Sequence, residues 1–212
     1  MADAVQELLE GMVPELHELV LYNLLSKAEV RLVVKKRSDF EYRLRRRTAD
    51  KDDYIRYVQY ELTLDKLLAK RKERLALEDK EAGNRTSFSC ARNIHFIYDR
   101  AVKKFKGDVA LWLEWVSYAK AQSSHKALSK IFARALQLHP RNAALWIHAA
   151  AWEFEEQRNV QAARQLLQRG LRLNGKSRDL WREYFKMEVL FVTRLTERRR
   201  ILGLDAGLEE LE

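Results

Sequence analysis

The sequence contains few residues that interrupt helices. Only 2 of its 212 residues are proline and 7 are glycine. Proline lacks a backbone donor and glycine loses the most conformational entropy, so both disfavour helix interiors. The common residues are Leu, Ala, Arg, Lys and Glu, which favour helices. Strand-like alternation is hard to find. The sequence predicts an all-α fold.

Several functional motifs are also missing. The single cysteine, Cys90, cannot form an intrachain disulfide, which suits a reducing compartment. No signal peptide or membrane-spanning apolar run occurs, so we expect a soluble intracellular protein. A glycine-rich phosphate loop and a His-Glu-x-x-His pair are absent from the sequence. We therefore predict no catalytic, cofactor-binding or metal-binding residues, no small-molecule substrate, and no enzymatic activity.

The chain carries an excess of positive charge. Forty Lys and Arg residues stand against 31 Asp and Glu residues, a formal net charge of +9. This excess suits an anionic or acidic partner, although basic helical surfaces also serve solubility. The net charge alone does not show whether the basic residues bind an acidic partner or only keep the protein soluble.

A repeat is the strongest signal in the sequence. Three tryptophans stand 34 and then 35 residues apart: Trp112, Trp146 and Trp181. Each lies four positions after a residue suited to helix N-caps, namely Asp108, Asn142 and Ser177. Each also lies 12 positions after an arginine, namely Arg100, Arg134 and Arg169. Because the tryptophans and the arginines recur with the same spacing, the sequence indicates tandem helical hairpins.

One hairpin consists of a helix A, which carries the tryptophan, and a helix B. Apolar residues of helix A recur at three and four positions and form one face. The small residues of helix B, Ala101, Ala135 and Gly170, allow close helix approach. Because neither helix can bury its apolar face alone, the hairpins must stack side by side. We expect the tryptophans to form the core and the three arginines to make structural pairs or end helices.

A weaker copy of the repeat lies upstream. Tyr54, Tyr57 and Tyr60 are spaced by three, and Glu61 follows the first tyrosine by seven residues. The same offset links Trp146 to Glu153 and Trp181 to Glu188. We expect Tyr54 to take the tryptophan position of an earlier helix A. Its helix B would lie near residues 90–105, after an extended helix and a polar loop at residues 81–87.

These patterns predict three regions. Residues 1–48 form an N-terminal helical extension, in which Pro14 opens one helix and Ser26 and Glu29 cap another. Residues 49–202 hold the repeats. Residues 203–212 form an acidic tail of a chain that we interpret as a fragment. The expected A helices lie near residues 52–75, 109–121, 143–157 and 178–192, and the B helices near 90–105, 126–138 and 160–172.

The repeat resembles half-a-TPR (HAT) repeats, because an aromatic pair with a following glutamate precedes an Ala-Arg and Arg-Ala-Leu pattern. Ala119 and Gly170 depart from that pattern. The stretch from Val30 to Glu61, with Arg46-Arg47-Thr48 leading into Lys51-Asp52-Asp53-Tyr54, is similar to the U3 small nucleolar RNA-associated protein 6 family. The resemblance implies a right-handed α-solenoid of TPR-like hairpins. It further implies a UTP-B subunit of the small-subunit processome that acts in the nucleolus on 18S rRNA.

Basic clusters are the candidate contacts to RNA phosphate or to acidic protein segments. They comprise Lys35, Lys36, Arg37, Arg43, Arg45, Arg46, Arg47, Lys70, Arg71, Lys72 and Arg74. The leading hypothesis is a protein scaffold whose partners are other UTP-B subunits, with U3 RNA or pre-rRNA as further candidates. The alternatives are direct pre-rRNA binding through the basic helices, and a HAT scaffold of pre-mRNA splicing or 3′-end processing.

Overall fold

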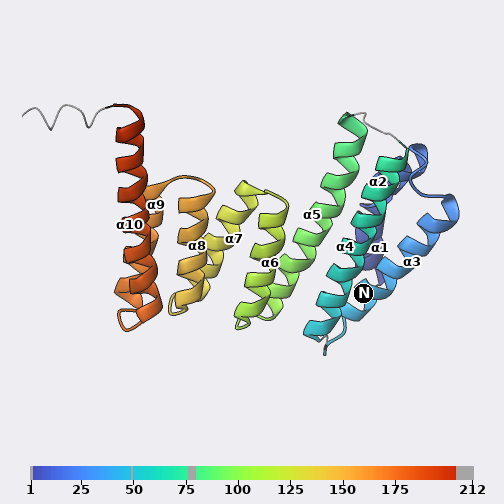
Figure 1. Ribbon diagram of the computed structural model, residues 1–212. Helices are drawn as coiled ribbons and strands as arrows, with labels where there is room; N and C mark the ends of the chain where they lie inside the picture. The colour runs from blue at the N-terminus through green and yellow to red at the C-terminus, as the bar shows by residue number, and fades with distance from the viewer. Residues whose placement is uncertain (1, 49, 76–79, 204–212) are drawn as a thin grey trace, which may run out of the picture. The chain divides into compact units, whose positions relative to one another are not determined.

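The computed structural model describes residues 2–48, 50–75 and 80–203, and the side chains within this range apart from those of residues 2–4 and 80–88 (Figure 1). The described residues form α-helices and no strands. The predicted all-α fold is therefore confirmed. The helices are α1 (Ala2–Glu10), α2 (Val13–Leu21), α3 (Lys27–Leu44), α4 (Lys51–Arg74), α5 (Lys80–Lys104), α6 (Val109–Ala121), α7 (His125–Leu138), α8 (Ala143–Glu155), α9 (Val160–Leu173) and α10 (Arg178–Ile201).

Side-chain hydrogen bonds cap the starts of several of these helices. Ser26 accepts a hydrogen bond from the Glu29 backbone, and the Glu29 carboxylate accepts one from the Ser26 backbone, which completes the predicted capping box of α3. Asn142 and Ser177 accept bonds from Leu145 N and Leu180 N at the starts of α8 and α10. Such caps satisfy backbone donors that have no partner within the helix. These caps thus help to fix where α3, α8 and α10 start.

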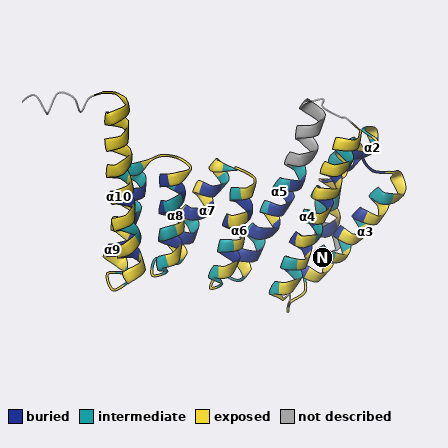
Figure 2. Ribbon diagram, viewed as in Figure 1, coloured by how far each residue is buried: buried dark blue, intermediate teal, exposed yellow. Residues whose placement is uncertain are grey.

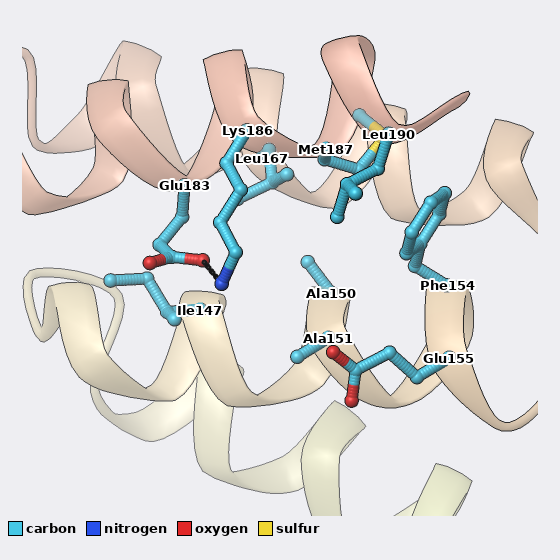
Figure 3. A pocket seen from close by; sticks show the side chains of 10 residues that line it. All are labelled: Ile147, Ala150, Ala151, Phe154, Glu155, Leu167, Glu183, Lys186, Met187 and Leu190. Carbon is cyan, nitrogen blue, oxygen red and sulfur yellow. Dashed lines mark hydrogen bonds and ion pairs between the residues drawn. The ribbon is translucent and has the colours of Figure 1, made fainter. Parts of the chain in front are cut away.

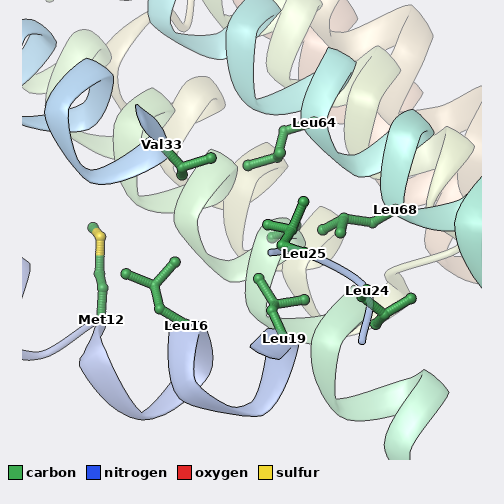
Figure 4. Packing of buried hydrophobic residues seen from close by; sticks show 9 residues of the cluster. Met12, Leu16, Leu19, Leu24, Leu25, Val33, Leu64 and Leu68 are labelled. Atoms are coloured by element: carbon green, nitrogen blue, oxygen red, sulfur yellow. The ribbon is translucent and has the colours of Figure 1, made fainter. Parts of the chain in front are cut away.

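The chain divides into two compact units, residues 1–115 and 116–212. In the first unit, α2, α3, α4 and α5 enclose an apolar cluster around the 24–25 turn (Figure 4). Its buried members are Met12, Leu16, Leu19, Leu24, Leu25, Val33, Leu64, Leu68 and Cys90. Burial raises the pKa of the Cys90 thiol to about 12, so this cysteine is a protonated member of the core rather than a reactive thiolate.

In the second unit, α8 packs against α7, α9 and α10. The contact between α8 and α9 is close at one repeat position. A Cβ added to Gly170 would lie 2.9 Å from Cγ of Trp146, closer than real side chains come. Gly170 therefore allows the Trp146 ring to lie directly on the α9 backbone, as its small size suggests.

The polar loop expected at residues 81–87 is wrong, because α5 begins at Lys80 and runs through this stretch. Gly83 and Asn84 weaken a helix by only about 1 kcal/mol each at most. The long helix α5 packs along α4, and such tertiary packing overrides weak local preferences. Residues 204–212 of the predicted tail lie outside the described part of the chain.

Candidate partner-binding surface

The repeat tryptophans occupy two environments. Trp112 and Trp146 are buried, and Trp146 Nε1 donates a hydrogen bond to the Pro140 carbonyl at 2.9 Å. Trp181 makes the corresponding bond to the Gly175 carbonyl at 3.1 Å, six residues back, yet 54% of Trp181 is exposed. The expectation that Trp181 faces the core is wrong. Its ring lies on an open face of α10, a helix that is mostly exposed in Figure 2.

The repeat arginines also differ from one another. Arg100 binds both carboxylate oxygens of Glu41, at 2.7 Å each, and its guanidinium lies 4.5 Å from the Phe96 ring centroid. Burial alone would lower the pKa of Arg100, but the hydrogen bonds and charge of Glu41 raise it. Arg134 is half-buried and Arg169 is exposed. The same sequence position therefore does not give the same environment.

A second arginine position links neighbouring helices. Arg37 of α3 binds Glu61 of α4 through two bonds of 2.8 Å, and Arg164 of α9 binds Glu188 of α10 through two bonds of 2.6 Å. Both pairs are 24 residues apart. Glu61 and Glu188 are the residues seven positions after Tyr54 and Trp181. α3 thus meets α4 through the same contact that helix B α9 makes with the following helix A, α10.

The intermediate repeats lack the residues for this pair. A spacing of 24 pairs Ser129 with Glu153, and His95 with Ala119. Glu153 is half-buried, and its burial raises its pKa. His95 instead accepts a hydrogen bond from Trp115 Nε1 at 2.8 Å, and burial lowers its pKa. The two Arg–Glu pairs with this spacing of 24 residues coincide with the two 24-residue A helices, α4 and α10, whereas α6 and α8 have 13 residues each.

Two predicted basic contacts are used inside the fold. The sequence predicts Arg37 as a surface contact, but only 3% of its side chain is exposed and Glu61 neutralises it. Arg71 binds both oxygens of Glu29, at 2.6 and 2.9 Å, and the Leu24 carbonyl. These hydrogen bonds lower the pKa of Glu29 to about 2. The prediction is wrong for Arg37, and Arg71 is committed to holding α3 to α4.

The remaining basic residues separate into groups. Since Glu29 meets Arg71 and Arg37 meets Glu61, α3 and α4 run antiparallel. The end of α3 and the end of α4 therefore lie at opposite ends of the pair. Exposed side chains at the end of α3 are Arg43, Arg46 and Arg47, those at the end of α4 are Lys70 and Arg74, and Lys35 and Lys36 lie between. Arg45 and Lys72 are half-buried and make further interactions. The predicted basic residues therefore lie in separate groups on this helix pair.

Hollows on the surface differ in size and lining. Between α8, α9 and α10, a cavity of about 30 Å³ lies beside Met187, Leu190 and the Glu183–Lys186 pair (Figure 3). This volume is comparable with the space of about one water molecule. A larger hollow of about 800 Å³ lies near the end of α10, lined by Arg158, Arg194 and Arg198 among others. A third, of about 360 Å³, lies between α3 and α4.

The described residues, 2–48, 50–75 and 80–203, contain neither a candidate metal site nor a candidate membrane span. Within them, no group of three or more His, Cys, Asp or Glu side chains is arranged to hold a metal ion. None of the helices there combines the length and apolar character required to span a bilayer.

The C-terminal part of the chain matches a known class of helical repeat. Residues 97–200 match the family model described as PRP39 N-terminal HAT repeat. Together with the all-α fold and the repeated helix contacts, this match shows that the chain contains tandem HAT repeats, as the sequence predicts.

Most of the chain is also similar to a group of named proteins. Residues 9–93 match the model of U3 small nucleolar RNA-associated protein 6. The human protein of that name is 38% identical over 199 residues, 94% of this chain and 33% of the relative. The Schizosaccharomyces pombe protein is 40% identical over 202 residues, 95% of this chain and 41% of the relative. The predicted resemblance to the U3 small nucleolar RNA-associated protein 6 family is confirmed.

A more distant relative from Dictyostelium discoideum, named U3 small nucleolar RNA-associated protein 6 homolog, is 32% identical over 210 residues. The aligned region covers 99% of this chain and 34% of the relative. The chain thus spans about a third to two fifths of the length of these curated relatives.

Proposed function

We propose that this chain is a non-catalytic scaffold of ribosome biogenesis that holds protein partners in the small-subunit processome during 18S pre-rRNA processing. The observation that carries the proposal is the 38–40% identity to U3 small nucleolar RNA-associated proteins over 94–95% of the chain. The helical repeats support a scaffold, because stacked hairpins present long surfaces for other proteins. We expect the partners to be UTP-B subunits and the location to be the nucleolus.

Copurification tests this function. The tagged chain, expressed in the cells from which it comes, should enrich U3 RNA and UTP-B proteins over a tagged control protein. Its depletion should cause 18S precursors to accumulate while the large-subunit rRNA continues to mature. Enrichment of spliceosomal or 3′-end-processing components in place of U3 RNA would instead establish the alternative HAT scaffold. The relatives that match both the N-terminal region and the repeats bear the U3 name, and this argues against that alternative.

Direct binding to pre-rRNA is a second candidate function. The exposed side chains of Arg43, Arg46 and Arg47 at the end of α3 favour it, because arginines contact phosphates readily. Substituting Glu for Arg46 and Arg47 should weaken RNA retention and reduce its salt dependence if these residues bind phosphate. The matched control is the Lys126→Glu and Lys130→Glu variant on α7, which changes the net charge equally. Unchanged RNA binding in the Arg46 and Arg47 variant would exclude this role.

A further inference from the structure

An apolar groove lies between α3 and α4 on the surface of the first unit. Its volume is about 360 Å³. Leu32 and Leu67 stand at its edges, with 64% and 42% of their surface exposed, whereas Val33 and Leu64 are buried beneath them. The other lining residues are Leu25, Glu29, Lys36, Tyr60 and Thr63. The two exposed leucines and the buried side chains between them form an apolar surface that another apolar side chain could cover.

Positive side chains flank this groove on both helices. Lys35 lies three residues after Leu32 on α3, and Lys70 lies three residues after Leu67 on α4, so each lysine shares a helix face with a groove leucine. Lys36 lines the groove itself. All three lysines are exposed. A partner on the groove would therefore meet aliphatic side chains flanked by ammonium groups.

The acidic group in the groove does not cancel this charge. Both carboxylate oxygens of Glu29 bind the guanidinium of Arg71, and one of them also accepts the Ser26 backbone hydrogen bond. The side-chain hydrogen bond to Arg71 is the largest cause that lowers the pKa of Glu29 to about 2. Glu29 is thus ionised and paired at neutral pH. Asp39, three residues after Lys36 on α3, and Glu73, three residues after Lys70 on α4, are the exposed acids next along these two helix faces.

We propose that the α3–α4 groove is a docking site for an acidic protein segment that places apolar side chains between Leu32 and Leu67. The aliphatic floor would bury the anchors, and Lys35, Lys36 and Lys70 would attract the carboxylates around them. The inference rests on the proposed scaffold function, since it supplies a surface through which the scaffold holds a protein.

The lining of the groove favours protein over RNA. Single-stranded RNA is held by stacking its bases on exposed aromatic rings. The one aromatic ring in the lining, Tyr60, is half-buried and tilted against Phe40, with ring centroids 5.6 Å apart. The exposed lining residues are Leu32, Leu67, Lys36 and Thr63, none of which is aromatic. Leucine offers a base no planar partner, but it packs well against aliphatic anchors of a peptide.

Site-specific photocrosslinking in the assembled particle tests the proposal. Leu67 is replaced by benzoylphenylalanine in the tagged full chain, and the particle is purified, irradiated and analysed by mass spectrometry. The control carries the same residue at Leu21, which is 63% exposed on α2 and does not line the groove. The expected product joins position 67, but not position 21, to a protein segment that combines Asp or Glu residues with apolar ones.

Charge reversal sharpens the test. In the Leu67 crosslinking background, the Lys36→Glu and Lys70→Glu variant should reduce the yield by about fivefold or more, since both lysines would then repel the acidic segment. The control pair Lys126→Glu and Lys130→Glu, two exposed lysines on α7, should leave the yield unchanged. Circular dichroism establishes that both variants remain folded.

Several outcomes would overturn the docking proposal. These are a crosslink to RNA, a crosslink to a second copy or another part of this chain, a segment without acidic residues, or no crosslink at position 67. U3 RNA is quantified in the same purified particle. If U3 RNA is retained while the groove crosslink fails, the docking proposal alone is wrong. If U3 RNA is not enriched, the proposed function itself fails.

Discussion

The contact between α3 and α4 and the contact between α9 and α10 use the same two residue types at the same spacing, but in different surroundings. The Arg37 and Glu61 side chains are 3% and 0% exposed, whereas those of Arg164 and Glu188 are 35% and 30% exposed. Each glutamate receives two hydrogen bonds from its arginine. The geometry is therefore shared, and the difference lies in how much water surrounds the charges.

Burial changes what the two ion pairs contribute. Removing one partner from a buried pair leaves an uncompensated charge in a poorly solvated site, whereas an exposed charge regains water. The buried pair thus ties α3 to α4, and the half-buried Arg164–Glu188 pair adds less to stability. The same arginine–glutamate contact can therefore be important for stability in one place and contribute little in another.

The largest effect should come from breaking the buried pair. Glu61→Gln removes the charge that compensates Arg37, and we expect the free energy of unfolding to fall by about 3–5 kcal/mol. Glu188→Gln should cost less than about 1 kcal/mol, because its pair is solvated. Urea denaturation followed by far-UV circular dichroism measures both. Equal losses in the two variants would show that burial does not separate the pairs.

Trp146 and Trp181 allow the effect of burial to be compared for an apolar side chain. Trp146→Ala should destabilise the protein by about 3 kcal/mol, because it empties a buried site. Trp181→Ala should cost less than half as much, since 54% of Trp181 is already exposed. Thermal and urea unfolding of the two variants under the same conditions provide the values. A loss for Trp181→Ala as large as that for Trp146→Ala would contradict the exposed position of its ring.

A smaller effect is expected at the helix contact beneath Trp146. Gly170→Ala gains up to about 1 kcal/mol of helix propensity, but its methyl group would overlap the buried indole, and overpacking costs about 1–3 kcal/mol. We expect a net loss of about 1 kcal/mol. Gly107→Ala is the control, because nothing lies within 4 Å of an added Cβ there. If Gly170→Ala proves as stable as the control, the contact is looser than the structure indicates.

The smallest effect should arise at the half-buried Arg71–Glu29 pair, and it should depend on pH. Chiefly through the Arg71 hydrogen bond, folding lowers the pKa of Glu29 from an ordinary 4.5 to about 2. A carboxyl whose pKa is lowered on folding stabilises the protein fully above its unfolded pKa and loses that contribution as the pH falls towards its folded pKa. The stabilisation should therefore be constant above about pH 5 and disappear towards pH 2.

The Glu29→Gln variant isolates this dependence. The difference in melting temperature between the original protein and Glu29→Gln should be largest near neutral pH and shrink as the pH falls from 4.5 to 2. Glu73→Gln, an exposed carboxylate on α4, serves as the control. A difference that does not vary with pH would mean that the Glu29 charge is not what Arg71 recognises.

Much of the fold follows from patterns that are local in the chain. The N-caps at Ser26, Asn142 and Ser177 and the spacing of the tryptophans predict where helices begin and which hairpins repeat. The same reading failed at residues 81–87, where glycine and asparagine suggest a loop. Local propensity is too weak there to end a helix that packs along α4.

The candidate surface was harder to predict, because charge does not reveal exposure. The side chains of Arg37 and Lys36 are neighbours in a basic run, yet one is buried against Glu61 and the other lines a groove. The spacing of residues in the sequence could have revealed that Arg37 pairs with Glu61. Arg37 stands 24 residues before Glu61, as Arg164 stands before Glu188. The groove between Leu32 and Leu67 has no comparable signal, because it requires the antiparallel placement of two helices.

By itself, the amino-acid sequence determined the helical class, the repeat period, the capping residues and the family resemblance, because each depends on residue types at short or regular spacings. Only the tertiary structure decided which arginines are neutralised, that Trp181 is exposed, and where an apolar groove remains open. Those properties depend on which side chains from distant segments exclude water from a given site. Equivalent positions in a repeat therefore need not have equivalent surroundings.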